Sequence, residues 1–229
     1  MEIYREKIKL DREVPTSRLV RIMQDVGGQH NRSNGLSRQV LRDKGLFWII
    51  VSNYIELERY PDPGEELEIT TWRGKRKRTL LPRYLVAKDR EDKVVFRGSA
   101  FWAMLNAESH KMANPVKYGL SPAEAVTGEE CRLPAMIKKK ETTHDSSFIV
   151  PEEYIDTNNH MNNTYYFDVC ERCLRDELNG RKLKEATIDY VSEAKLGEKI
   201  KLSWAENGDK IYVQGEKQNT IFRTNLRYV

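Results

Sequence analysis

A short polar segment, residues 156–163, combines the side chains of this chain that are best suited to chemistry. It places a carboxylate, an amide and an imidazole at alternate positions, Asp156, Asn158 and His160. In an extended segment, residues two apart point to the same side, so these three groups can converge on one spot. An imidazole carries protons near neutral pH, and a helix N-terminus just beyond would add backbone N–H donors suited to a developing oxyanion. The spacing therefore indicates a site for proton transfer to or from a bound substrate.

The same segment also has a purely structural interpretation. Asp and Asn favour turns and helix N-caps through local hydrogen bonds alone. On this interpretation His160 bonds only to the backbone, and Asn162 and Asn163 are capping residues rather than support for a site. Both interpretations require a turn followed by an amphipathic helix.

Composition narrows the class of protein. The chain has 229 residues, of which 32% are charged and 39% hydrophobic, as expected for a soluble globular protein of one large or two small domains. The longest apolar run, residues 46–51, is far too short to cross a membrane. The N-terminus is charged from its second residue and lacks a signal-peptide core, so we expect a cytoplasmic protein without membrane insertion.

Three cysteines do not make a disulfide framework. Cys170 and Cys173 form a C-x-x-C pair, which can be redox-active or bind a metal. No second pair completes a zinc site, and both residues fall on the apolar face of an expected helix, so we predict buried core thiols. No phosphate-binding glycine loop or other cofactor motif is evident, and we expect neither a cofactor nor a metal.

The two halves of the chain repeat one pattern. Each has an apolar helical face with i, i+3, i+4, i+7 spacing, formed by Leu19, Ile22, Met23 and Val26 in the first half and by Tyr166, Val169, Cys170 and Cys173 in the second. After each helix come alternating strands, and a turn glycine before a strand that ends in tryptophan recurs, Gly64 with Trp72 and Gly197 with Trp204. Each half therefore reads as strand, helix and four strands, which predicts an α+β protein.

The alternation predicts strands near residues 2–9, 47–59, 65–73, 79–88 and 93–106 in the first half, and near 144–150, 183–193, 198–206, 210–217 and 220–228 in the second. We expect two domains, residues 1–125 and 143–229, with a linker at 126–142 rich in charge, Pro and Gly. Each domain should be an antiparallel sheet wrapped around one long helix.

The net charge of +4 is mild, but five cations in six residues gather between two predicted strands, Arg73, Lys75, Arg76, Lys77 and Arg78. This run is either a solvated hairpin turn or a docking patch for an acidic protein or nucleic acid. No helix-turn-helix, zinc finger or aromatic RNA-binding signature accompanies it, so we expect no nucleic-acid partner.

Taken together, these motifs resemble the acyl-acyl carrier protein thioesterases, the family of the plant FatA and FatB enzymes and their shorter bacterial relatives. The family's D-x-N-x-H-x-N-N motif is met by Asp156, Asn158, His160, Asn162 and Asn163. In the first half, Trp48, the turn at 61–64, Thr71 with Trp72, and the strand at 99–106 also look like the family's pattern. The resemblance covers nearly the whole chain.

The resemblance implies a tandem double hot dog fold and a catalytic set of Asp156, Asn158, His160 and Glu193. Ala194 stands where many relatives have cysteine, so no thiol nucleophile is available there. Asn106, where an aspartate is common, is a second departure. The first half lacks an equivalent series, so we expect one active site per chain, with the acyl-binding pocket in the first half.

The implied activity is hydrolysis of fatty acyl-acyl carrier protein to free fatty acid, which ends chain extension in fatty acid synthesis. His160 would carry the proton, Glu193 would orient it or hold the water, and Asn158 would hold the carbonyl or the water. Asp156 could polarise a neighbour, act as base or act as nucleophile. Two alternatives stay open: an acyl-coenzyme A thioesterase, and a non-catalytic module that binds acyl chains or carrier protein. The partner would be a carrier protein bearing a phosphopantetheine-linked acyl chain, and the chain could be a monomer or a homodimer.

Overall fold

The structure is a computed structural model that describes residues 2–229, and it divides into two compact units. The first unit comprises the chain up to Val14 together with Arg21–Pro134, and the second comprises Pro15–Val20 and Ala135–Val229. The boundary between the units thus falls inside the segment expected as a linker: residues up to Pro134 belong to the first unit, and residues from Ala135 belong to the second. The first turn of the first helix is counted with the second unit.

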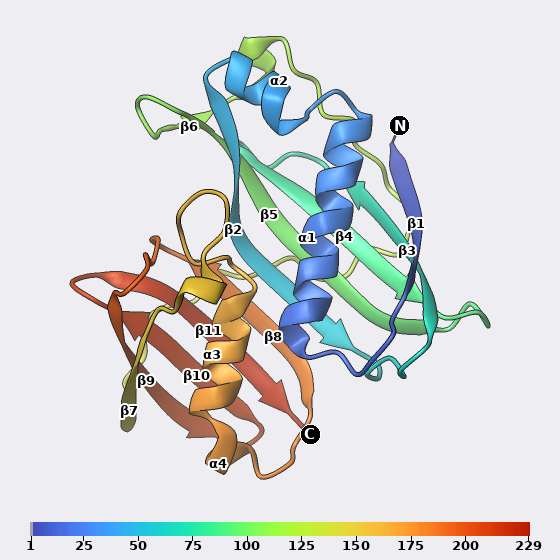
Figure 1. The fold of residues 1–229 in the computed structure, drawn as a ribbon. Coiled ribbons are helices and arrows are strands. Elements are labelled where there is room, and N and C mark those ends of the chain that lie inside the picture. Colours follow the sequence, from blue (N-terminus) through green and yellow to red (C-terminus); the bar gives the residue numbers. More distant parts are fainter. Residues whose placement is uncertain (1) are drawn as a thin grey trace. The chain divides into compact units, whose positions relative to one another are not determined.

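The first unit is built on one antiparallel sheet (Figure 1). Its strands are β1 (Ile3–Lys9), β2 (Leu46–Leu57), β3 (Glu66–Arg73), β4 (Leu80–Lys88), β5 (Val94–Asn106) and the short β6 (Met112–Ala113). Their order is β1-β3-β4-β5-β2, and β6 pairs with β5. The helical elements are α1 (Thr16–Ser33), α2 (Arg38–Asp43) and the 3-10 turn η1 (Pro115–Tyr118).

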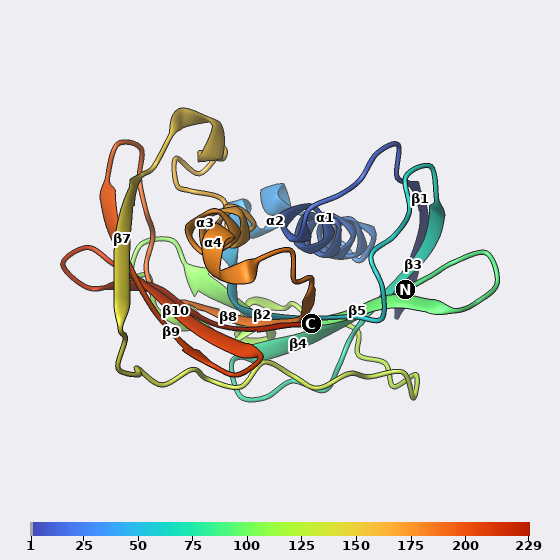
Figure 2. The ribbon, with the colours of Figure 1, turned by 90° about the horizontal axis from the view of Figure 1, so that it is seen from below.

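Helix α1 lies along one face of this sheet, as Figure 2 shows for its course over β4 and β5. Its apolar face is buried, with Ile22, Met23 and Val26 at most 6% exposed. Met23 lies directly over Gly98 of β5, where a Cβ atom would overlap its sulfur and methyl group. The glycine therefore leaves the space that the end of the Met23 side chain fills.

The second unit repeats the plan with five antiparallel strands of its own (Figure 1). Its strands are β7 (His144–Ile149), β8 (Leu183–Tyr190), β9 (Lys199–Asn207), β10 (Lys210–Glu216) and β11 (Thr220–Tyr228), in the order β8-β11-β10-β9-β7. A 3-10 turn, η2 (Glu152–Tyr154), precedes α3 (Tyr165–Cys173) and α4 (Arg175–Leu178). Figure 2 shows α3 and α4 on one face of this sheet.

The α+β plan and the ten strands expected from alternation are confirmed, with ends that differ by up to three residues. The expectation of one long helix per sheet is wrong for the second unit. There α3 ends at Cys173 and a turn at Leu174 separates it from the four-residue α4. The helical path then stops because Asn179 and Gly180 both have positive φ angles, 44° and 79°, which a right-handed helix does not accept.

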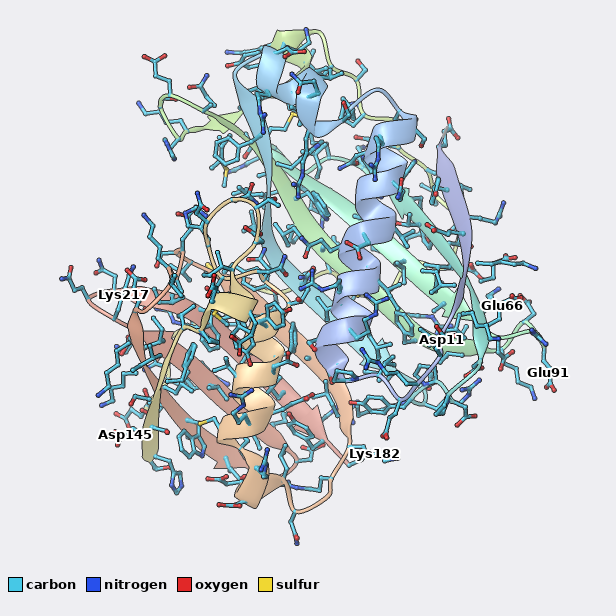
Figure 3. The ribbon with its side chains drawn as sticks, viewed as in Figure 1. Asp11, Glu66, Glu91, Asp145, Lys182 and Lys217 are labelled. Carbon is cyan, nitrogen blue, oxygen red and sulfur yellow. The ribbon has the colours of Figure 1, made fainter. Side chains whose placement is uncertain are left out.

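Charged side chains extend from the strand edges and turns of both units (Figure 3). Asp145 on β7 and Lys217 in the turn after β10 are exposed examples, and Lys217 pairs with Glu198 at 2.8 Å. Among residues 2–229, no helix has both the length and the apolar composition that crossing a membrane requires. Because charged side chains generally lie at the surface, a charged side chain that is buried is unusual.

Candidate active site

The predicted polar segment folds as a tight turn. The Asp156 backbone N–H donates to the His160 carbonyl at 2.9 Å, and the Asn159 N–H donates to the Asp156 carbonyl at 3.0 Å. Asn159 has a φ of 62°, in the left-handed region that Asn tolerates better than most residues. The expectation of an extended segment is therefore wrong, because the left-handed residue reverses the chain between Asn158 and His160.

The Asp156 side chain stabilises this turn. Its carboxylate accepts a hydrogen bond from the Asn158 backbone N–H at 2.7 Å and one from the Asn158 side-chain Nδ2 at 3.3 Å. The first of these is the local bond of an Asx-turn. The turn interpretation thus accounts for part of the Asp-x-Asn pattern. The same hydrogen bonds hold the Asn158 carboxamide beside the Asp156 carboxylate.

Backbone hydrogen bonds attach the end of the turn to one residue much later in the chain and to one residue before the turn. The Met161 N–H donates to the Ala194 carbonyl at 2.8 Å, and Asn162 N–H donates to the Tyr154 carbonyl at 2.9 Å. Met161 and Ala194 are both buried, at 3% and 0% exposed. The residues just before them in the chain, His160 and Glu193, are consequently held next to each other.

The His160 imidazole and the Glu193 carboxylate are in hydrogen-bond contact, with Nε2 and Oε2 2.8 Å apart. Their side chains are 27% and 62% exposed, so solvent reaches both groups. An exposed pair contributes little to stability because water screens the charges. The His160–Glu193 contact therefore contributes little to the stability of the fold.

The carboxylate also determines which imidazole nitrogen can act as a base. Because Glu193 accepts at Nε2, that nitrogen keeps its hydrogen, and Nδ1 carries the lone pair of the neutral ring. This tautomer is assigned from the hydrogen-bond partner. His160 can then accept a proton at Nδ1 while Glu193 stabilises the resulting cation.

The structure brings together all four predicted catalytic residues. Asp156 bonds to Asn158, the backbones of Asp156 and His160 are paired, and His160 contacts Glu193. Their catalytic roles stay predictions. An imidazole held by a carboxylate, beside an amide held by another carboxylate, can activate water and bind a carbonyl oxygen.

Asn162 and Asn163 support the turn instead of extending the polar cluster. The Asn162 side-chain oxygen accepts from the backbone N–H and the hydroxyl of Thr164, at 3.0 and 2.9 Å. The Asn163 carbonyl accepts from the Tyr190 hydroxyl at 3.1 Å. Asn162 thus serves the entry into α3, which begins at Tyr165.

Tyr166 is a contributor that the sequence motifs did not reveal. Its hydroxyl is hydrogen-bonded to the Ala194 backbone, and burial raises the pKa of this phenol well above its usual value. Tyr166 therefore stays neutral and helps to fix the segment after β8 that carries Glu193. The only available signal was its place on the apolar face of the helix, which does not distinguish this role from packing.

The C-x-x-C pair is confirmed as buried for Cys170, at 1% exposed, but Cys173 is only partly buried. Burial raises the pKa of both thiols, to about 11 for Cys173, which opposes formation of a reactive thiolate. No group of three or more His, Cys, Asp or Glu in the described residues is arranged to hold a metal ion.

The basic run expected to dock a partner is not uniform. Lys75, Lys77 and Arg78 are exposed, and Arg76 is partly buried with its guanidinium 2.6 Å from the Asn114 side-chain oxygen. Arg73 is only 2% exposed, so its place in a docking surface was predicted wrongly. It lies at the end of β3 with its side chain on the buried face, whereas the other four follow the strand.

Profiles of two protein-family domains match the chain. The acyl-ACP thioesterase N-terminal domain matches residues 1–117, and the acyl-ACP thioesterase C-terminal domain matches residues 137–227. Curated relatives include a chloroplastic acyl-[acyl-carrier-protein] hydrolase of Cuphea viscosissima, 22% identical over 203 residues, and a chloroplastic oleoyl-acyl carrier protein thioesterase of Coriandrum sativum, 26% identical over 207 residues. These alignments cover 82% of the chain but 49% and 56% of the relatives, so the chain spans about half the length of the curated relatives it matches.

Solved structures agree with this assignment at the level of the fold. An acyl-ACP thioesterase from Bacteroides thetaiotaomicron has a TM-score of 0.89 at 19% identity, with 99% of this chain and 98% of that chain covered. The 12:0-ACP thioesterase from Umbellularia californica has a TM-score of 0.82 at 15% identity, with 99% and 97% covered. Because the two domain profiles together match most of the sequence, the chain belongs to the acyl-ACP thioesterase family, and its fold is the double hot dog fold of that family.

Proposed function

We propose that this protein hydrolyses fatty acyl-acyl carrier protein thioesters to free fatty acid and carrier protein, and so ends fatty acid chain extension. The observation that carries the proposal is the His160–Glu193 pair, 2.8 Å between Nε2 and Oε2, on a turn that also holds Asp156 and Asn158. Family membership supports the thioester as the substrate class.

In the first step His160 acts as the general base. Nδ1 takes a proton from water, and the water oxygen forms a bond to the thioester carbonyl carbon. Glu193 stabilises the imidazolium through the hydrogen bond at Nε2. The negative charge moves to the carbonyl oxygen, where a hydrogen-bond donor is needed.

Asn158 is the candidate donor for that oxygen. One hydrogen of its Nδ2 is directed to the Asp156 carboxylate at 3.3 Å, which leaves the second N–H for the substrate. In this assignment Asp156 is a positioning residue rather than the nucleophile. Its two hydrogen bonds to Asn158 prepare the amide before the substrate arrives.

In the second step the oxyanion collapses and the carbon–sulfur bond breaks. The thiolate of the phosphopantetheine leaves and takes the proton from His160, which returns to the neutral form. A thiol has a pKa of about 8.5, so it leaves far more easily than an alkoxide and needs little acid catalysis. One histidine is therefore enough for both proton transfers.

Because residue 194 is alanine, no thiol is available there, and with Asp156 assigned to positioning Asn158 the nucleophile in this proposal is water. Ala194 is fully buried and uses its backbone carbonyl to fix Met161, as described above. No covalent acyl-enzyme through a thiol can form at that position.

The carrier protein would dock through the exposed basic residues Lys75, Lys77 and Arg78, with the partly buried Arg76 at their edge. Acidic partners are steered by such clusters, and the effect weakens as salt screens the charges. Acyl-coenzyme A is the alternative substrate, since it also carries phosphates. The cytoplasmic location, one active site per chain and the choice between monomer and dimer stay predictions.

The test is a panel of acyl-carrier-protein thioesters of graded chain length, with the matching acyl-coenzyme A thioesters, at several salt concentrations. We expect released thiol and released fatty acid in equal amounts, with a rate on carrier-protein substrates that falls more steeply with salt. Turnover of the coenzyme A thioesters alone would support the alternative substrate. Binding of acyl-carrier protein without any release of thiol would identify a non-catalytic binding module and reject the proposal.

A further inference from the structure

Two segments of the first unit that are far apart in the sequence lie against each other. They are residues 74–79, which connect β3 to β4, and residues 110–117, which include β6 and the start of η1. The Arg76 guanidinium donates to the Asn114 side-chain oxygen at 2.6 Å, and the same oxygen accepts from the Val116 backbone N–H at 3.2 Å. The two segments together form one surface, the paired-segment surface.

The backbone of the second segment is fixed from the interior. Ala113 and Leu120 are 6% and 7% exposed and belong to a hydrophobic cluster that includes Leu41 of α2. The Asn114 side chain caps the start of η1, and Gly119 ends it with a φ of 70°. A surface whose backbone is already ordered loses little conformational freedom when a partner binds.

The paired-segment surface is strongly basic. Its two segments contain six Lys and Arg residues and no Asp or Glu. Five of these cationic side chains are exposed: Lys75, Lys77, Arg78, Lys111 and Lys117. In the part of the chain that the structure describes, none of the five forms an ion pair. A carboxylate from outside the two segments, that of Glu124, accepts from the Arg76 backbone N–H at 2.9 Å. Such a cluster of cations attracts an acidic partner.

Two apolar side chains are exposed on the same surface. Met112 is 49% exposed and Val116 57%, and the Met112 sulfur lies 3.1 Å from the Thr79 hydroxyl of the other segment. Their neighbours Ala113 and Pro115 are buried, so this segment turns one side inward and the other outward. Apolar groups beside charged ones are the usual composition of a protein interface, in which an apolar centre is surrounded by a polar rim.

This composition favours a protein partner over a nucleic acid or a lipid surface. A nucleic acid is bound mainly through its phosphates, which would leave Met112 and Val116 unused. Adsorption to a lipid surface relies on large apolar side chains such as Trp, Phe and Leu, and the two segments contain none of these. An acidic protein with apolar side chains among its carboxylates would use both components of the surface.

We propose that the paired-segment surface docks the acyl carrier protein, and that Met112 and Val116 make apolar contacts with it while Lys111 and Lys117 add to the cations of the basic run. The proposal rests on the proposed function, which supplies the acidic carrier as the partner. It extends the docking site from the basic run to a second segment with a different contact chemistry. The cations raise the rate of encounter, and the apolar contacts slow dissociation.

The test measures calorimetric binding of carrier protein, bearing phosphopantetheine but no acyl chain, to the whole chain at several salt concentrations. Met112→Ser combined with Val116→Ser should weaken binding about five- to tenfold at every salt concentration, because salt does not screen apolar contacts. Lys111→Gln combined with Lys117→Gln should weaken binding at low salt and reduce its salt dependence. All four side chains are exposed, so the melting temperature should not change.

Matched controls come from outside the two segments. Met136→Ser alters an apolar residue that is 82% exposed, and Lys210→Gln alters an exposed lysine of β10; both variants should keep full affinity. With acyl-carrier protein as substrate, the docking variants should raise KM and leave kcat unchanged. With a carrier-free acyl-coenzyme A thioester they should behave like the unaltered protein.

Three results would overturn the proposal: unchanged affinity in the combined Met112 and Val116 variant, an equal loss in Met136→Ser, or tighter binding to phosphatidylglycerol vesicles than to carrier protein. The proposed function fails separately. If the unaltered protein hydrolysed no thioester but bound the carrier protein with the losses expected for the docking variants, the hydrolase assignment would be rejected and the docking surface would stand.

Discussion

The two units have the same sheet and helix plan but treat charge in opposite ways. In the second unit, an imidazole and a carboxylate meet on an exposed turn, where His160 and Glu193 are 27% and 62% exposed. In the first unit, like charges meet in the interior, where Arg73 and Arg83 are at most 5% exposed. The common scaffold therefore does not determine whether ionisable groups are exposed or buried.

The free-energy cost of placing these ionisable groups also differs between the two units. Water solvates and screens the exposed pair, so the turn can hold it at little expense and also let substrate and solvent reach it. The buried pair loses its hydration, and the Asn31 side-chain oxygen, which accepts from both guanidinium groups, replaces only part of it. Solvent and substrate can therefore reach the exposed pair, whereas the buried guanidiniums are closed to both.

Removing the imidazole should produce the largest effect. For His160→Ala we expect kcat/KM on acyl-carrier protein to fall by about 10²–10⁴, because a positioned general base contributes about that factor. His110→Ala, which alters an exposed histidine of the first unit, is the matched control and should keep full activity. Steady-state thiol release measures both. Equal activity of the two variants would remove the catalytic distinction between the units.

The next comparison concerns the free energy of unfolding when one buried glycine of each unit is replaced by alanine. A Cβ atom at Gly215 would overlap the Phe222 ring, while one at Gly98 would meet the flexible end of Met23. Phe222 is fully buried and packs on Tyr166, so it cannot move aside. We expect Gly215→Ala to lower the free energy of unfolding by about 1–3 kcal/mol and Gly98→Ala to change it less.

Urea unfolding of the two glycine variants tests this difference. If Gly98→Ala proved the more damaging, the second unit would have the more adaptable core, contrary to the packing described here.

The charge of Glu193 should have a smaller effect on turnover than the imidazole. Glu193→Gln keeps a hydrogen-bond acceptor for Nε2 but removes the negative charge, and solvent already screens that charge. We expect kcat to fall about tenfold with little change in KM, and Glu193→Asp to recover part of the loss. A change in KM alone would show that the residue contributes to substrate binding and not to the proton transfer.

Much of the fold was accessible from the sequence because alternation and helical spacing report which side of an element is buried. The same rules could not predict the reversal at Asn159, since a left-handed φ depends on the closing hydrogen bonds of the turn. They also could not pair His160 with Glu193 without the family resemblance, because the contact depends on the bond between Met161 and Ala194.

Arg83 shows a different limit of prediction from the sequence. Its place between Leu81 and Leu85 on β4 assigns it to the buried face, so alternation alone could have found it. A buried arginine contradicts the usual preference of charged residues for solvent. What permits it is the space left by Gly27 and the amide of Asn31, more than 50 positions earlier in the chain. Arg73 was assigned to the surface because its neighbours in the basic run are exposed.

The smallest expected effect concerns one thiol of each unit. Burial raises the pKa of Cys131 in the first unit and of Cys173 in the second to about 11, against an ordinary value of 9.0. Between about pH 9 and 11 the folded state therefore keeps protons that the unfolded state has lost, and the free energy of unfolding falls as pH rises through this window.

Alkylation by iodoacetamide reports the same pKa shift residue by residue. In the native protein Cys131 and Cys173 should react slowly at neutral pH, with rates that rise toward pH 11, whereas in urea the rise should centre near pH 9. Cys170, which is 1% exposed, should react only after unfolding. Mass spectrometry of the labelled peptides distinguishes the three thiols. Rapid labelling of Cys173 at pH 7 would mean that its environment is more polar than that of Cys131, and the two units would then differ in their thiols as they do in their charges.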